Sequence, residues 1–263
     1  MKLQKIVYFA LSCLCSFPIF AEGALCQDPG ILDLTDRGSV TDTPCTVPKK
    51  DILIEGGYQL QTLIPNNTLS NYPQTQLVFG LPGRTELFAD APNYNIQTNP
   101  DLLGFSAVSL GAKTLFFSGE SYAIAGQGII TIPGGSHNFG SPGTGYTANA
   151  IGTYKLSRLF SIASMVGGSS TTEPSVAGGG RFNSFNYSAS LGFAPIEQLS
   201  FFGELFGQTK TSPDTNDGLD GDFGLLYAVA ENVSLDAEYA NRINGDIGGY
   251  RNYVGAGVTA VFG

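Results

Sequence analysis

The sequence predicts an all-β chain, a transmembrane, antiparallel, up-and-down β-barrel of about twelve strands behind a cleaved signal peptide. Three observations predict it. Apolar and polar residues alternate over stretches of roughly ten residues, the length of a tilted membrane-spanning strand. Short and long connections alternate along the chain. No amphipathic-helix pattern occurs, and no apolar run of about 18 residues follows the first 21, so no transmembrane helix is expected.

The first 21 residues have the layout of a secretory signal peptide. Lys2 and Lys5 precede the apolar run IVYFALSCLCSFPIF, and Ala21 then offers a cleavage point. The alternative is a lipoprotein signal that ends at Cys13 or Cys15. Either cysteine leaves a very short apolar region, and the preceding residues fit a lipobox poorly. We therefore expect an exported protein, cleaved near Ala21.

The next segment, 22–50, is predicted to be a periplasmic extension that carries a disulfide. It holds Cys26 and Cys45, and two close thiols in an oxidising compartment are expected to pair, the alternative being two free buried thiols. A loop of roughly 20 residues closed in this way gains about 3 kcal/mol in the chain-entropy model. The barrel itself is expected over 51–263.

Composition narrows the classes of partner. The chain has 22 acidic and 13 basic residues and no basic run, so nucleic acid is not an expected partner. With His137 as its single histidine, it offers no Cys/His cluster for a metal. We expect no metal and no cofactor.

Five segments carry the clearest period-2 alternation. They are DILIEGGYQLQ (51–61), AVSLGAKTLF (107–116), FNYSASLGF (185–193), NVSLDAEYANRI (232–243) and VGAGVTAVF (254–262). In the fourth, Val233, Leu235 and Ala237 fall on one face, with Asp236 and Glu238 on the other. Hydrocarbon solvates neither charges nor open backbone, so the sheet is expected to close with its apolar face toward lipid.

The connections fall into two interleaved sets. Short turns are predicted near 81–84, 117–120, 157–158, 194–198 and 230–232. Longer loops are predicted near 62–74, 90–104, 133–143, 169–183, 209–220 and 242–250. This alternation predicts an outer-membrane barrel of a Gram-negative bacterium with both termini in the periplasm. A soluble β-sandwich shares the alternation of residues but does not predict the two sets of connections.

Strand parity also predicts which polar side chains line the lumen. The charged members are Glu55, Arg84, Glu86, Lys113, Lys155, Glu204, Asp236 and Glu238, and the amides are Gln59, Gln127, Asn149 and Gln208. Two interpretations remain open. The charges form a mutually neutralising network that packs the interior, or some of them line a narrow pore and select solutes.

Four stretches resemble a known family. GRTELFADAPNY (83–94), SLGAKTLFF (109–117), ITIPGG (130–135) and the region from FFGELFGQ to ANRING (201–245) are similar to the outer-membrane proteins named for the MetA pathway of phenol degradation, often labelled transporters. The resemblance covers most of the chain from residue 52. It implies a barrel and passage of small, hydrophobic or aromatic solutes. The absence of Trp and the cysteine-bearing extension depart from the family.

The sequence therefore predicts passive transport of small solutes through the outer membrane. The alternative is a structural or surface-interaction barrel with a blocked lumen and binding outer loops. Expected partners are outer-membrane lipids, the solute, and the barrel assembly machinery, which reads an aromatic C-terminal strand such as the one that ends at Phe262.

Catalysis is not expected. His137 lies between Ser136 and Ser141 in a Gly-rich loop, and neighbours in sequence rarely form a triad. The Asp-rich stretch SPDTNDGLDGDFG (212–224) resembles a calcium loop only loosely, because its Gly is misplaced and no Glu closes it. Turn formation is the expected role of that stretch.

Overall fold

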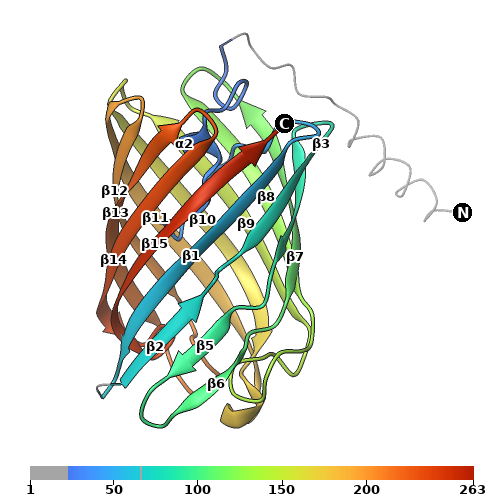
Figure 1. Ribbon diagram of the computed structural model, residues 1–263, viewed down its shortest axis with the longest axis vertical. Helices are drawn as coiled ribbons and strands as arrows, with labels where there is room; N and C mark the ends of the chain where they lie inside the picture. Colours follow the sequence, from blue (N-terminus) through green and yellow to red (C-terminus); the bar gives the residue numbers. More distant parts are fainter. Residues whose placement is uncertain (1–22, 66) are drawn as a thin grey trace, which may run out of the picture.

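A computed structural model describes residues 23–65 and 67–263; the predicted signal peptide, 1–21, lies outside the described residues. The described chain forms one antiparallel sheet. Its last strand, β15 (Tyr250–Phe262), pairs with its first, β1 (Ile52–Leu63), which closes the barrel (Figure 1). The helical elements described are α2 (Ile31–Leu34) and η2 (Ser175–Ala177). Neither of them could span a bilayer.

Fifteen strands make twelve barrel positions, as the sequence predicts. Three positions are each shared by two strands that follow one another in sequence. Both strands of such a pair form hydrogen bonds to the same neighbouring position of the barrel. The shared positions hold β2 (Asn67–Tyr72) with β3 (Gln76–Leu81), β4 (Thr85–Asp90) with β5 (Tyr94–Gln97), and β6 (Leu102–Phe105) with β7 (Ser109–Ser118). The continuous strands besides β1 and β15 are β8 (Tyr122–Thr131), β9 (Gly145–Lys155), β10 (Phe160–Thr172), β11 (Arg181–Ile196), β12 (Leu199–Gln208), β13 (Gly218–Ala230) and β14 (Val233–Gly245).

The three interruptions occur on adjacent barrel positions. Pro73 and Pro92 lie in two of them, and a proline has no N–H to donate to a ladder. The wall continues across the interruptions through single hydrogen bonds, such as the one from the Ala91 amide to the Thr75 carbonyl (2.9 Å). The prediction of long loops at 62–74 and 90–104 is therefore wrong. Strands such as NTLSNY are polar on both faces, so they carry no alternation of hydrophobicity.

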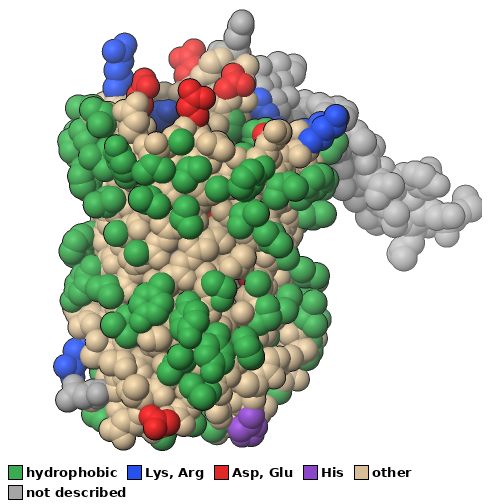
Figure 2. All heavy atoms as spheres, viewed as in Figure 1, with side chains coloured by type: hydrophobic (Ala, Val, Ile, Leu, Met, Phe, Trp, Pro, Cys, Tyr) green, Lys and Arg blue, Asp and Glu red, His purple; other side chains and the backbone are tan. Residues whose placement is uncertain are grey.

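The barrel wall exposes apolar side chains on its outer face and buries polar side chains on its inner face, the reverse of a water-soluble protein. On β14, Leu235 is 45% exposed on the outside, whereas Asp236 is 5% exposed on the inside. Phe223 on β13 and Val258 on β15 are likewise exposed on the outside. Figure 2 shows apolar side chains over the sides of the barrel, with the visible Lys, Arg, Asp and Glu side chains mostly at its two ends. A surface of this kind suits hydrocarbon rather than water.

The two ends of the barrel differ in their connections. The predicted short turns are present between β3 and β4, β7 and β8, β9 and β10, β11 and β12, and β13 and β14. They lie at the end that also holds the C-terminus and α2, at the top of Figure 1, which we call the turn end. Longer connections, at 132–144, 173–180 and 209–217, lie at the opposite end, the loop end, together with short connections after β1, β5 and β14. The predicted short turns are thus confirmed at one end, and three of the six predicted long loops are present at the other.

Candidate functional site: a lumen crossed by the N-terminal segment

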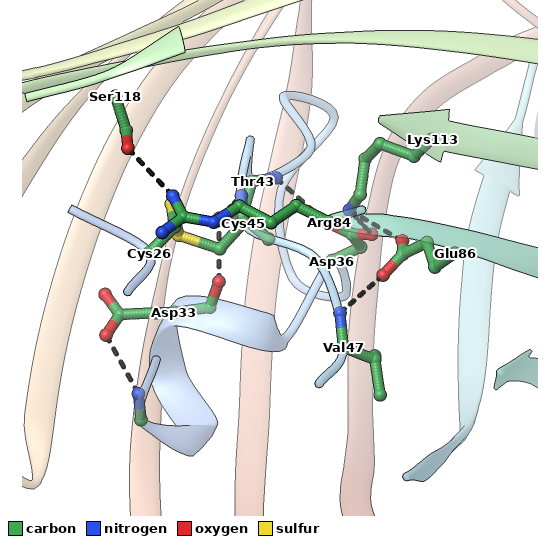
Figure 3. The surroundings of a disulfide bond; sticks show 11 residues. Cys26, Asp33, Asp36, Thr43, Cys45, Val47, Arg84, Glu86, Lys113 and Ser118 are labelled. Carbon is green, nitrogen blue, oxygen red and sulfur yellow. Dashed lines mark hydrogen bonds and ion pairs between the residues drawn. A yellow bond between two sulfur atoms is a disulfide. The ribbon is translucent and has the colours of Figure 1, made fainter. Parts of the chain in front are cut away.

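Residues 23–50, which we call the N-terminal segment, lie at the turn end of the barrel, and most of their buried residues, within 31–47, are inside it. Cys26 and Cys45 form the disulfide that the sequence predicts, with their Cα atoms 5.0 Å apart (Figure 3). The single turn of α2 packs against β13, β14 and β15. The segment and the barrel wall also share an apolar cluster, formed by Leu34, Cys45, Val47, Leu53, Val78 and Phe88. The segment is therefore a packed part of the interior.

A buried charge cluster joins the segment to β4 and β7. The Lys113 ammonium lies 2.8 Å from Asp36 Oδ2 and 3.1 Å from Glu86 Oε1, and Lys113 is 1% exposed. The other oxygen of Glu86 accepts the Val47 amide at 2.7 Å (Figure 3). Glu86 and Lys113 are also directly opposite each other across the β4–β7 pair. A buried ammonium needs such partners, because burial disfavours an unpaired charge.

Glu204 on β12 holds the middle of the segment. Its two carboxylate oxygens accept the backbone amides of Val40 and Thr41, each at 2.8 Å, and the Thr41 hydroxyl also donates to it. The Thr41 hydroxyl contacts that of Ser188 on β11 at 2.6 Å. A carboxylate that accepts several N–H and O–H groups is stabilised in its charged form. Glu204 thus fixes residues 40–41 against the wall.

Two more predicted lumen carboxylates contact the segment. Glu55 accepts the Asp36 amide at 3.1 Å, and Asp236 accepts Arg37 Nε at 3.2 Å. With Glu86, Lys113 and Glu204, these groups lie on β1, β4, β7, β12 and β14, so the segment crosses the lumen. In one of the two interpretations of the sequence, the lumen charges neutralise one another. Glu86 and Lys113 do so, but most of the predicted charges also bind the segment, because it brings its own charges and free amides.

The other predicted charges lie elsewhere. Glu238 accepts the Tyr253 hydroxyl at 3.4 Å. Arg84 lies in the turn before β4, and its Nη1 donates to Ser118 Oγ at 3.1 Å. Lys155 is exposed at the turn end of β9. Among the amides, Gln127 on β8 contacts the N-terminal segment at Asp42.

Asp42 belongs to the N-terminal segment, not to a spanning strand. Gln127 on β8 donates to its Oδ2 at 2.6 Å. Burial raises the pKa of the Asp42 carboxyl from its ordinary 3.8 to about 7, and the negative charge of Asp36 also raises it. Lys113 and the Gln127 hydrogen bond act in the opposite direction. The deep position of residue 42 therefore favours its neutral form.

Sequence reasoning missed the residues that the segment contributes. Asp36, Arg37, Thr41 and Asp42 lie in TDRGSVTD (35–42), which has neither strand nor helix periodicity. Its only signal is a charged stretch between two paired cysteines. The interpretation of 212–224 as turn is wrong at its end, where Asp220 and Asp222 face the lumen on β13. The alternation in GLDGDFG was a usable signal for that strand.

Two cavities adjoin different parts of the segment. One, of about 880 Å³, lies at the turn end against residues 23–33 and the turns that include Lys155, Arg158 and Glu231. The other, of about 340 Å³, lies against residues 36–42 and is lined by Glu55, Asp90 and Glu238. The segment lies between these two spaces.

The serine residues that the sequence offers as candidates for catalysis form hydrogen bonds to backbone carbonyls. The Ser136 hydroxyl donates to the Phe105 carbonyl at 3.3 Å, and Ser141 donates to the Gly143 carbonyl at 2.8 Å. His137 is exposed. Within residues 23–65 and 67–263, no group of three or more His, Cys, Asp or Glu residues is arranged to hold a metal.

A closed sheet with an apolar outer face and a charged interior defines the class of this protein: it is a transmembrane β-barrel of twelve strands. No protein-family model matches the chain, and no curated protein matches it. Solved structures do share its fold. The COG4313 outer membrane channel from Pseudomonas putida F1 matches with a TM-score of 0.67 at 11% identity, over 87% of this chain and 100% of that one.

Two porins have the same fold at similar distance. The KdgM porin matches with a TM-score of 0.56 at 12% identity, over 80% of this chain and 99% of that one. The NanC porin matches with a TM-score of 0.53 at 12% identity, over 80% and 98%. Identities this low establish the shared barrel and nothing about solutes.

Proposed function

We propose that the protein is a channel of the Gram-negative outer membrane for passive passage of small solutes, gated by its own N-terminal segment. The observation that carries the proposal is the inverted burial of a closed barrel, with apolar side chains outside and charged side chains inside. Apolar side chains on the outside are stable in the hydrocarbon of a membrane, and polar side chains on the inside are stable against water in a lumen. The fold shared with porins and channels supports it.

The turn end then faces the periplasm, and the loop end faces the medium. In the proposed orientation, the extension of residues 22–50 is periplasmic and follows a signal peptide cleaved near Ala21, which are the predictions from the sequence. Phe262 ends β15 and is 54% exposed on the outside, where the barrel assembly machinery would recognise it.

Passage requires the N-terminal segment to move or to leave a narrow path beside it. The cavities of about 880 and 340 Å³ on its two sides are the spaces that such a path would join. The buried charges Lys113, Glu86 and Glu204 hold the closed arrangement. The predicted lumen charge Glu238, which lines the cavity of about 340 Å³, is proposed to act on the solute.

The solute is the finer part of the proposal. The resemblance to the family named for the MetA pathway favours small, hydrophobic or aromatic compounds. An alternative function is a structural or surface-interaction barrel with a blocked lumen. The segment that crosses the lumen is the observation that favours this alternative.

Planar-bilayer recordings separate the two functions. We expect the mature protein to give small conductance steps, and we expect Glu86→Gln and Lys113→Gln to change them because both contacts to the segment weaken. Lys155→Gln, at an exposed position, is the matched control. Absence of conductance from the wild type, from these variants and from a barrel without residues 23–50 would exclude a channel and leave the blocked barrel.

A further inference from the structure

The guanidinium group of Arg37 lies in a cradle in the barrel wall. Its Nε donates to Asp236 Oδ2 at 3.2 Å, and its Nη1 donates to Gln74 Oε1 at 3.1 Å. Gly57 and Gly257 pair directly across the β1–β15 junction beneath it. A Cβ atom at either glycine would overlap the guanidinium atoms. The wall is thus hollowed where the planar cation lies.

The cradle holds more acceptor capacity than Arg37 uses. Asp236 is 5% exposed, and its Oδ1 has no hydrogen-bond partner among the described residues. A carboxylate can accept two parallel N–H groups from one guanidinium, but Arg37 supplies one to Asp236. The Asp236 carboxylate therefore faces a ligand position that Arg37 of the N-terminal segment fills only in part.

An acidic cavity adjoins the cradle. This space of about 340 Å³ has Arg37 itself as the single basic residue of its lining. Its other polar side chains include Glu55, Gln59, Gln76, Asp90, Glu238 and Tyr253. The volume is that of a small-molecule site. A cation bound in the cradle would have room here for the rest of the molecule.

We propose that the cradle and this cavity form a binding site for small organic cations that carry a guanidinium group. Arg37 occupies the site in the closed arrangement, and a guanidinium solute competes with it. The flat notch above Gly57 and Gly257 favours a planar group over a compact ammonium. The inference rests on the proposed function and names a solute class for it.

The test uses the full mature chain in detergent and ligand-observed saturation-transfer NMR with methylguanidinium as the probe. Arg37→Ala should bind the probe, since the cradle is then vacant, and the wild type should bind it more weakly. Adding Asp236→Asn should weaken binding by roughly tenfold, the effect of losing a charge-assisted hydrogen bond. Adding Gly257→Ala, whose methyl group fills the notch, should also weaken binding of methylguanidinium by roughly tenfold. Methylammonium should bind to the Arg37→Ala variant less well than methylguanidinium does.

Far-UV circular dichroism verifies the barrel, and Arg37→Gln replaces Arg37→Ala if the latter does not fold. Absence of binding to a folded Arg37 variant, or binding that Asp236→Asn leaves unchanged, overturns the site. Binding does not require passage through the membrane. Conductance without guanidinium binding therefore refutes only this inference, and binding without conductance refutes only the proposed function.

Discussion

The wall that binds the N-terminal segment and the neighbouring wall on β13 treat buried charge differently. In the first region, Lys113, Glu86 and Glu204 have close partners in the N-terminal segment. On β13, neither carboxylate oxygen of Asp222 has a hydrogen-bond partner within the part of the chain that the structure describes. Asp222 also lies directly opposite Glu204 across the β12–β13 pair, so like charges face each other there.

The difference separates two uses of charge. A buried charge with a partner in the same chain contributes to the position of that partner. One without such a partner costs free energy unless water or a solute compensates it. We therefore assign the charges that contact the N-terminal segment to holding it and the Asp222 carboxylate to the solute path. Four predictions test this division.

Deletion of residues 23–50 should have the largest effect. It removes every contact of the segment with the lumen, so conductance in planar bilayers should rise several-fold over that of the mature protein. Heat-modifiable migration on gels serves as the control for a folded barrel. Conductance equal to that of the intact protein would show that the segment does not limit passage.

Lys113→Met should destabilise the protein by about 3–5 kcal/mol, the cost of removing one partner from a buried ion pair. Asp36 and Glu86 then remain buried together without a cation. The measurement is the guanidinium chloride midpoint by far-UV circular dichroism, because the chain has no Trp. Lys155→Met, at an exposed position, should change stability by less than about 0.5 kcal/mol. Similar midpoints for both variants would contradict the assignment.

Glu204→Gln should have a smaller, local effect. The amide offers one acceptor oxygen where the carboxylate offers two, so one of the Val40 and Thr41 amides loses its partner. Losing a hydrogen bond to a charged group costs about 1.5–3 kcal/mol. Hydrogen exchange at these two amides should accelerate by roughly tenfold or more. Unchanged exchange would mean that other contacts hold residues 40–41.

The spanning strands of the barrel wall could be predicted from the sequence, because every second residue of such a strand faces lipid and must be apolar. In β14, Leu235 must face the lipid and Asp236 must face the lumen, because hydrocarbon does not solvate a charge. The same rule fails for β2, where each face is mostly polar, and for β5, whose four residues alternate over too short a run to identify a strand. The prediction of long loops there is wrong for that reason.

The N-terminal segment shows a second limit. Parity identifies Glu55 and Glu204 as polar groups that point inward, but it cannot say what they meet. Their partners, Asp36 and Thr41, lie some 19 and 163 residues away in the chain and meet them only when the barrel closes. An irregular segment has no periodicity from which its contacts could be predicted.

Asp222→Asn should have the smallest effect on stability and the opposite sign. Since the Asp222 carboxylate has no partner among the described residues, its neutral amide should change the unfolding free energy by no more than about 1 kcal/mol, in the stabilising direction. Exchange at Val40 and Thr41 should stay as in the wild type, in contrast to Glu204→Gln. In a KCl gradient, the reversal potential should shift toward lower cation preference, because one lumen charge is gone. A loss of stability as large as that of Glu204→Gln would instead place Asp222 among the groups that hold the segment, and the division between the two regions would then fail.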